Sequence, residues 1–96
     1  MEAEILYREV VGDGDDTEEG KNGIVVTLSH WTTTTDYARN HYLLESRVMI
    51  DRDLVVDECE LYFFQALPKM IRKAVAKVDQ LLELSPECVP YARREK

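Results

Sequence analysis

The stretch from Asp57 to Leu84 most constrains the fold, because it is the longest part of the chain that a single apolar face can explain. After Pro68, apolar residues recur at steps of three and four, which is the period of an α-helix. The inward positions are Ile71, Ala74, Val75, Val78, Leu81 and Leu82. The opposite side carries Lys69, Arg72, Lys73, Lys77 and Gln80. The pattern predicts an amphipathic helix with a basic outer face.

The residues before Pro68 also favour a helix. Asp57 can accept a hydrogen bond from the first free N–H groups, and Glu60 can reach back in a capping box. Pro68 lacks an N–H group and clashes with the preceding turn, so either one long helix kinks there or a second helix begins there. We predict a helix kinked near Pro68. It should end at Ser85, because the residue before Pro86 is disfavoured in a helix.

Three upstream segments alternate apolar and polar residues, as half-buried strands do. These segments are residues 2–11, 23–34 and 48–56, the last being interrupted if residues 51–53 form a turn. A threonine-rich run that ends in a cap-like Asp predicts a short helix over residues 37–45. The predicted fold class is α+β, a small antiparallel sheet of about three strands in the order strand, strand, helix, strand, helix.

The length of 96 residues and an apolar content of 45% predict a single domain over residues 1–96. A domain of this size leaves much apolar surface uncovered, so oligomerisation would be a natural supplement. The sequence has neither a long apolar run nor a basic, then apolar leader, so we expect a cytoplasmic protein without a membrane partner. Cys59 and Cys88 lack metal or redox spacing. We expect Cys59 to be a buried helical thiol, with a disulfide to Cys88 as the alternative.

The net charge of −7 is unevenly distributed. Residues 1–35 carry eight acidic side chains and two basic ones, and residues 36–67 carry seven and three. Residues 68–96 reverse the balance, with four acidic and seven basic side chains. The negative total disfavours direct binding of nucleic acid, because phosphate contacts need a dominant positive field. A local basic helix face remains, at Lys69, Arg72, Lys73 and Lys77.

Residues 12–20 hold five acids and three glycines, a composition that has nothing to bury. We predict a mobile acidic hairpin loop over residues 12–23 and an irregular tail over residues 86–96. The loop does not match a calcium-binding EF-hand, because Glu18 stands at the position of the obligatory glycine. Its carboxylates could instead imitate a run of phosphates and bind a basic groove on a partner. The residues concerned are Asp13, Asp15, Asp16, Glu18 and Glu19.

Candidate catalytic groups are sparse. Ser29 and His30 are adjacent in a predicted strand, so their side chains point to opposite faces and cannot form a nucleophile and base pair. Cys59 could meet His41 and Asp36 only through the tertiary fold, and isolated histidines more often serve packing or hydrogen bonding. We therefore predict no enzymatic activity and no cofactor.

Three consecutive aromatic residues, Tyr62, Phe63 and Phe64, lie within the predicted helix. Three neighbours on a helix cover about 300°, so they cannot all face one core. Either other segments of the chain cover the far side, or a second chain does. We predict a homodimer whose interface is formed by Tyr62, Phe63, Phe64, Leu67 and Ile71.

These observations favour a small acidic protein-binding module that blocks the basic surface of a partner protein. In composition alone, such domains are similar to phage-encoded inhibitors of host nucleic-acid-binding or defence machinery. The alternative is an oligomeric structural or assembly accessory subunit, in which the predicted long helix provides the contact.

Overall fold

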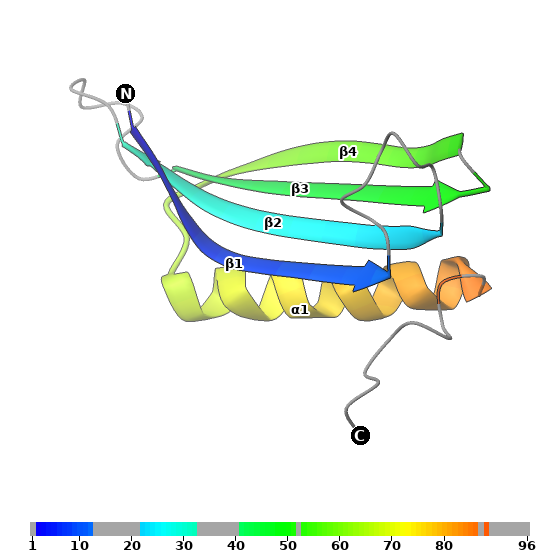
Figure 1. Ribbon diagram of the computed structural model, residues 1–96. Coiled ribbons are helices and arrows are strands. Elements are labelled where there is room, and N and C mark those ends of the chain that lie inside the picture. Colours follow the sequence, from blue (N-terminus) through cyan, green and yellow to red (C-terminus); the bar gives the residue numbers. More distant parts are fainter. Residues whose placement is uncertain (1, 13–21, 33–40, 52, 87, 89–96) are drawn as a thin grey trace.

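The computed structural model describes residues 2–12, 22–32, 41–51, 53–86 and 88 (Figure 1). Its elements are β1 (Glu2–Gly12), β2 (Gly23–Thr32), β3 (His41–Ile50), β4 (Asp53–Phe63) and α1 (Leu67–Leu84). The four strands form an antiparallel sheet in the order β1-β2-β3-β4, so each strand pairs with its neighbour in sequence. The helix α1 lies along one face of this sheet (Figure 1). The predicted α+β class is confirmed.

The core lies between α1 and the middle of the sheet, where α1 packs mainly against β2. Alternate residues of β2 and β3 point toward α1 and are buried, among them Ile24, Val26, Leu28, Leu44 and Val48. The helix contributes Met70, Ala74, Val78, Leu81 and Leu82. The predicted inward face of the helix is thus confirmed at its centre, whereas Val75 is 38% exposed. Met70, one turn before Ala74, was missing from the predicted face.

The predicted number and order of elements are wrong, because four strands precede a single described helix. Residues 41–45, predicted as part of a helix, begin β3, and residues 37–40 lie outside the described residues. In β3 the buried side chains alternate, with Tyr42, Leu44, Ser46 and Val48 all directed at the core. These residues form a strand, in which side chains alternate between the two faces, because their backbone N–H and C=O groups are hydrogen-bonded to β2 on one side and to β4 on the other.

The predicted kinked helix is also wrong in its first half, because residues 57–63 belong to β4. β4 is an edge strand, and its carboxylates Asp57, Glu58 and Glu60 are exposed, so they need no buried partners. α1 instead begins at Leu67, and Pro68 occupies its first turn, where a missing N–H group costs nothing. The alternative, that a helix begins at Pro68, is therefore closer to the structure. The predicted end at Ser85 is confirmed, as Ser85 is the C-terminal cap.

Asp51 forms a turn after β3, in part as one alternative for residues 51–53 anticipated, although Asp53 already belongs to β4. β3 ends at Ile50 and β4 begins at Asp53. Asp51 has a positive φ of 50°, and its backbone N–H donates to Oδ1 of Asn22 at 2.8 Å. This hydrogen bond connects the turn to the start of β2. The segment predicted as one strand over residues 48–56 therefore contains the end of β3 and the beginning of β4.

The residues after α1 return to the sheet. The N–H group of Cys88 donates to the carbonyl oxygen of Ser85 at 2.9 Å, and its Sγ lies 4.0 Å from the carbonyl oxygen of Met49. Cys88 is buried, whereas Cys59 is exposed on β4, and no disulfide joins the two. The prediction of a buried helical Cys59 is therefore wrong, because its segment is an edge strand. Of the predicted irregular tail, the structure describes only Pro86 and Cys88.

Phe64 links β4 to α1 in an unusual conformation. Its φ is 57°, in the left-handed region that a bulky residue seldom adopts, and its side chain is 78% exposed. We predict that Phe64→Gly is more stable than Phe64→Ala by about 1 kcal/mol, because both variants remove the same ring but only glycine relieves the backbone strain. Urea unfolding of the two variants measures the difference. Equal stabilities would contradict a strained backbone at this position.

Candidate interaction surface

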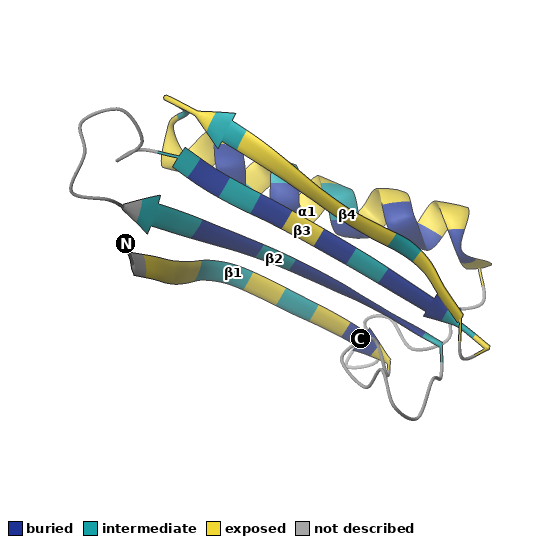
Figure 2. Ribbon diagram, turned by 90° about the horizontal axis from the view of Figure 1, so that it is seen from above, coloured by how far each residue is buried: buried dark blue, intermediate teal, exposed yellow. Residues whose placement is uncertain are grey.

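The face of the sheet that points away from α1 is not covered by any of the described elements. Strand alternation sends one side chain toward α1 and the next to this opposite side. No described helix or strand packs there, and Figure 2 looks directly onto it, with α1 behind the sheet. We call it the open face. Its composition changes along the strands.

One end of the open face is uncharged across all four strands. The strand register aligns two rows of four residues there, one from each strand. The outer row is Ala3, Trp31, His41 and Phe63, and the next row is Ile5, Ser29, Leu43 and Leu61. None of the eight is an Asp, Glu, Lys or Arg. We call these two rows the uncharged end.

Large apolar side chains are exposed at the uncharged end. Ile5 is 62% exposed, Leu61 51% and Phe63 44%. The indole Nε1 of Trp31 donates to Oγ of Ser29 at 2.9 Å, so the ring lies along the sheet and its only polar atom is satisfied. The ring of Phe63 lies 5.7 Å from that of His41 and 6.4 Å from that of Phe64, measured between centroids. These contacts form a continuous aromatic surface along the edge.

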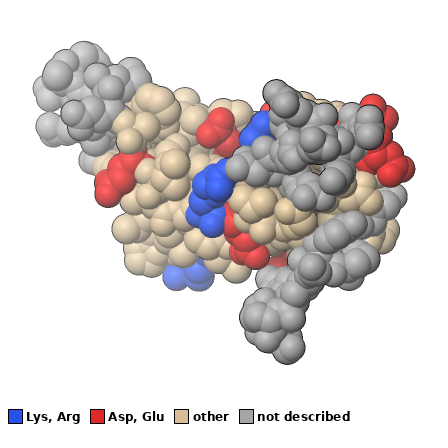
Figure 3. Space-filling view, in the orientation of Figure 1, with Lys and Arg blue, Asp and Glu red and all other residues tan. Residues whose placement is uncertain are grey.

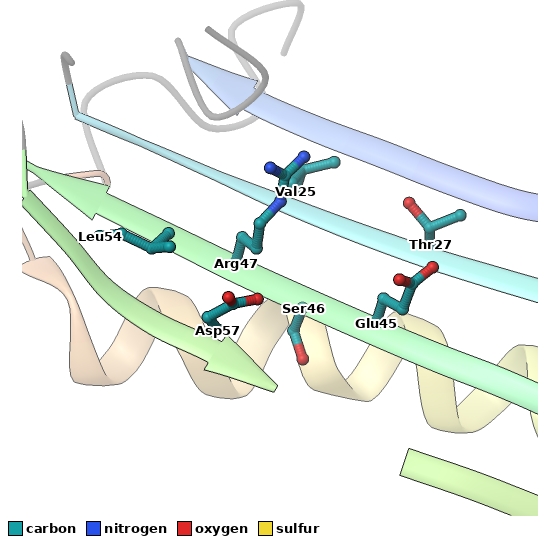
Figure 4. A pocket seen from close by; sticks show the side chains of 7 residues that line it. All are labelled: Val25, Thr27, Glu45, Ser46, Arg47, Leu54 and Asp57. Carbon is teal, nitrogen blue, oxygen red and sulfur yellow. The ribbon is translucent and has the colours of Figure 1, made fainter. Parts of the chain in front are cut away.

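The middle of the open face is charged. The next row along the strands is Arg8, Thr27, Glu45 and Cys59, and the row after it is Val10, Val25, Arg47 and Asp57. A hollow of about 280 Å³ lies between β2, β3 and β4 (Figure 4). Arg47 reaches across Val25, and Glu45 extends toward Thr27 (Figure 4). On the two edge strands the charges differ in sign, with Arg8 on β1 and Asp57 on β4, whereas β3 carries both Glu45 and Arg47.

The acidic side chains around β4 affect the pKa of Cys59. Its pKa lies above the ordinary value of a cysteine, because partial desolvation and the negative charges of Glu45, Asp57 and Glu60 all disfavour the thiolate. An exposed cysteine would normally be the more reactive thiol of this chain. Here the surrounding carboxylates reduce that reactivity at neutral pH.

We predict that Cys59 reacts with iodoacetamide more slowly at pH 8 than an unperturbed exposed cysteine, and that Glu45→Gln accelerates the reaction. Neutralising Glu45 removes one of the charges that raise the pKa, so more thiolate is present at a given pH. Mass spectrometry of the alkylated chain gives the rate for Cys59 separately from that of buried Cys88. Glu83→Gln, an exposed change on α1, is the matched control. An equal acceleration in both variants would contradict the local effect.

A second hollow, of about 240 Å³, lies between β4 and α1 on the covered side of the sheet. Lys73 Nζ is 5.2 Å from the centroid of the Tyr62 ring, and Lys77 Nζ is 4.0 Å from a carboxylate oxygen of Glu58. The Tyr62 hydroxyl donates to Glu60 at 2.9 Å, and its pKa is raised by desolvation and by this hydrogen bond. Charges of both signs therefore line this groove and offset one another.

The predicted basic helix face is divided by this arrangement. Lys69 and Arg72 are exposed, whereas Lys73 and Lys77 turn toward β4 and are half-buried. On the side seen in Figure 3, acidic and basic side chains are interspersed instead of forming a patch of one sign.

The residues predicted for self-association are also divided. Phe63 lies on the open face with Phe64 beside it, and Leu67 is exposed at the start of α1. Tyr62 and Ile71 pack against the core on the other side of the sheet. The predicted acidic partner-binding residues, Asp13, Asp15, Asp16, Glu18 and Glu19, lie outside the described residues. The sequence analysis did not include Trp31, Leu43 and Leu61 among the predicted binding residues. Once each segment is known to be a strand, their alternation with core-facing residues places them on the open face.

Comparison of the chain with protein-family models, curated proteins and solved structures gives no match. Among the described residues, no group of three His, Cys, Asp or Glu side chains is arranged to hold a metal ion. Within the same residues, no helix has the length and apolarity needed to cross a membrane.

Proposed function

We propose that this chain is a non-enzymatic protein-binding module that binds through its open face. The observation that carries the proposal is the uncharged end, where Leu61 and Phe63 are exposed on β4 and Ile5 is exposed on β1, at the opposite edge of the same two rows. Exposed apolar side chains gathered in one patch mark binding surfaces more often than scattered ones do. The aromatic residues there provide large contact areas with few rotatable bonds, which favours strong contacts in an interface.

The proposal is tested with Leu61→Asp, which places a charge at the β4 edge of the uncharged end without altering the core. Protein retained from a native lysate by the immobilised chain should be lost with this variant. Leu84→Asp is the matched control, because Leu84 is 71% exposed at the far end of α1. Retention that is the same for both variants and the unchanged chain would overturn the assignment of the open face.

A second candidate function is binding to the basic surface of a partner protein, as a phage-type inhibitor would do. The observation that favours it is the group of carboxylates Glu45, Asp57 and Glu60 around Cys59. In this case raising the salt concentration should release the retained partner, because exposed charge pairs are screened. Glu45→Gln should weaken retention, whereas Glu83→Gln should not. Retention that survives high salt would exclude this candidate.

A further inference from the structure

Building on the proposed function, we infer that the partner of the open face is a second copy of this chain. The two sheets pack face to face about a two-fold axis parallel to the strands, and the two α1 helices lie on the outside. The chain carries a net charge of −7, so two copies repel each other unless their contact avoids like charges. The uncharged end meets that condition, because none of its eight residues is an Asp, Glu, Lys or Arg.

The charged rows select the direction of the axis. Rotation about an axis parallel to the strands keeps each row level with itself and places β1 over β4 of the second copy. Arg8 then lies level with Cys59 of the second copy and beside Asp57 of the second copy. Rotation about an axis perpendicular to the strands would place each strand over itself and reverse the order of the rows, so that the uncharged end would lie over the charged rows. Opposite charges across an interface fix its register, and like charges oppose it.

Side-chain size agrees with the same arrangement. In the outer row, Ala3 of one copy lies opposite Phe63 of the other. In the next row, Ser29 lies opposite Leu43. Ala3 and Ser29 thus each face a larger residue, and the other opposed pairs are Trp31 with His41 and Ile5 with Leu61. Two sheets about 10 Å apart would bury all four pairs.

The size of the open face is sufficient for such a contact. A fifth row, Gly12, Gly23, Met49 and Leu54, follows the four already described. Four strands about 4.8 Å apart and five rows about 6.7 Å apart make a face of about 600 Å² in projection. Pleating makes the accessible area larger, and a stable interface buries about 800 Å² on each partner. The uncharged end alone is less than half of this face, so the charged rows have to be part of the contact, which is why their arrangement matters.

The experiment is sedimentation equilibrium of the full chain from about 1 to about 100 µM, the range over which a dimer of moderate affinity assembles. The expected mass rises to twice 11.1 kDa. Leu61→Asp should raise the dissociation constant at least about tenfold, and Leu84→Asp should leave it unchanged. Circular dichroism checks that both variants remain folded.

A charge exchange tests the axis. Arg8→Asp and Asp57→Arg should each weaken the dimer, and the two changes in one chain should restore it. Arg8 and Asp57 lie on the two outermost strands, so they do not meet within one chain and the restoration must arise between copies. A dimer that Leu61→Asp weakens but the double variant does not restore would overturn the stated axis.

The failure of this inference can be distinguished from failure of the proposed function. A mass of 11.1 kDa at all concentrations, together with lysate protein that Leu61→Asp releases, overturns the second copy as partner and leaves the open face as the binding surface. If that protein is also released by salt, the partner is the basic protein of the second candidate. A dimer that Leu61→Asp leaves intact places self-association elsewhere and overturns the inference.

Discussion

Val78→Asp is expected to unfold the protein. Val78 is fully buried at the centre of α1, where it packs into the core beneath the sheet. An aspartate there would place a charge in an apolar environment with no partner, which costs at least about 4 kcal/mol. A domain of this length has a free energy of unfolding of about 5 to 14 kcal/mol, so the loss removes much or all of it. Circular dichroism and thermal melting measure the effect.

Ala76→Asp is the matched control for Val78→Asp. Ala76 is exposed on the same helix, two residues away, so this variant adds the same charge without burying it. It should cost less than about 1 kcal/mol, mostly through the lower helix propensity of aspartate. Similar losses in the two variants would show that the helix presents a different face to the sheet. Lys77→Ala is a poorer control, because the Lys77 side chain is only 16% exposed and lies near Glu58.

Leu28→Ala should have the second largest effect. Leu28 is fully buried on β2, the strand against which α1 mainly packs. The substitution removes buried apolar atoms and leaves a cavity, at a cost of about 3 to 5 kcal/mol. We expect a cooperative urea transition displaced to lower denaturant concentration with an unchanged slope, because the unfolded surface is the same.

Leu84→Ala controls for the loss of a leucine side chain. Leu84 is exposed at the end of α1, so its truncation should cost less than about 1 kcal/mol. Both unfolding curves should be measured at low protein concentration, where association does not add to stability. A cost at Leu28 no larger than that at Leu84 would contradict the placement of β2 in the core.

The helix was predictable because its inner face is buried. Ala74, Val78 and Leu81 repeat with the helical period for the simple reason that they contact the sheet, and Pro86 marks the stop. β1 was predictable on similar grounds, since its core-facing residues alternate with exposed ones, whereas in β2 Val25 and Ser29 on the open face are buried as well. The antiparallel hairpin between them is confirmed.

β4 was not predictable from its own pattern. An edge strand beyond the main area of helix contact is exposed on both faces, so burial imposes little alternation on its residues. The acidic residues that protect such an edge, Asp57, Glu58 and Glu60, are also the residues that favour the start of a helix. On a helix, Tyr62, Phe63 and Phe64 would point in different directions around the axis. In the structure Tyr62 faces α1 and Phe63 faces the opposite side of the sheet.

The sequence by itself determined the α+β class, the first hairpin, the buried face and end of α1, and the acidic character of the chain, because each of these follows from local periodicity or composition. Only the tertiary structure decided that Trp31, Leu43, Leu61 and Phe63 share one surface. These residues come from three strands and are brought together by the register of backbone hydrogen bonds between strands, which joins residues far apart in sequence. No local pattern records that register, so the open face became visible only in the folded chain.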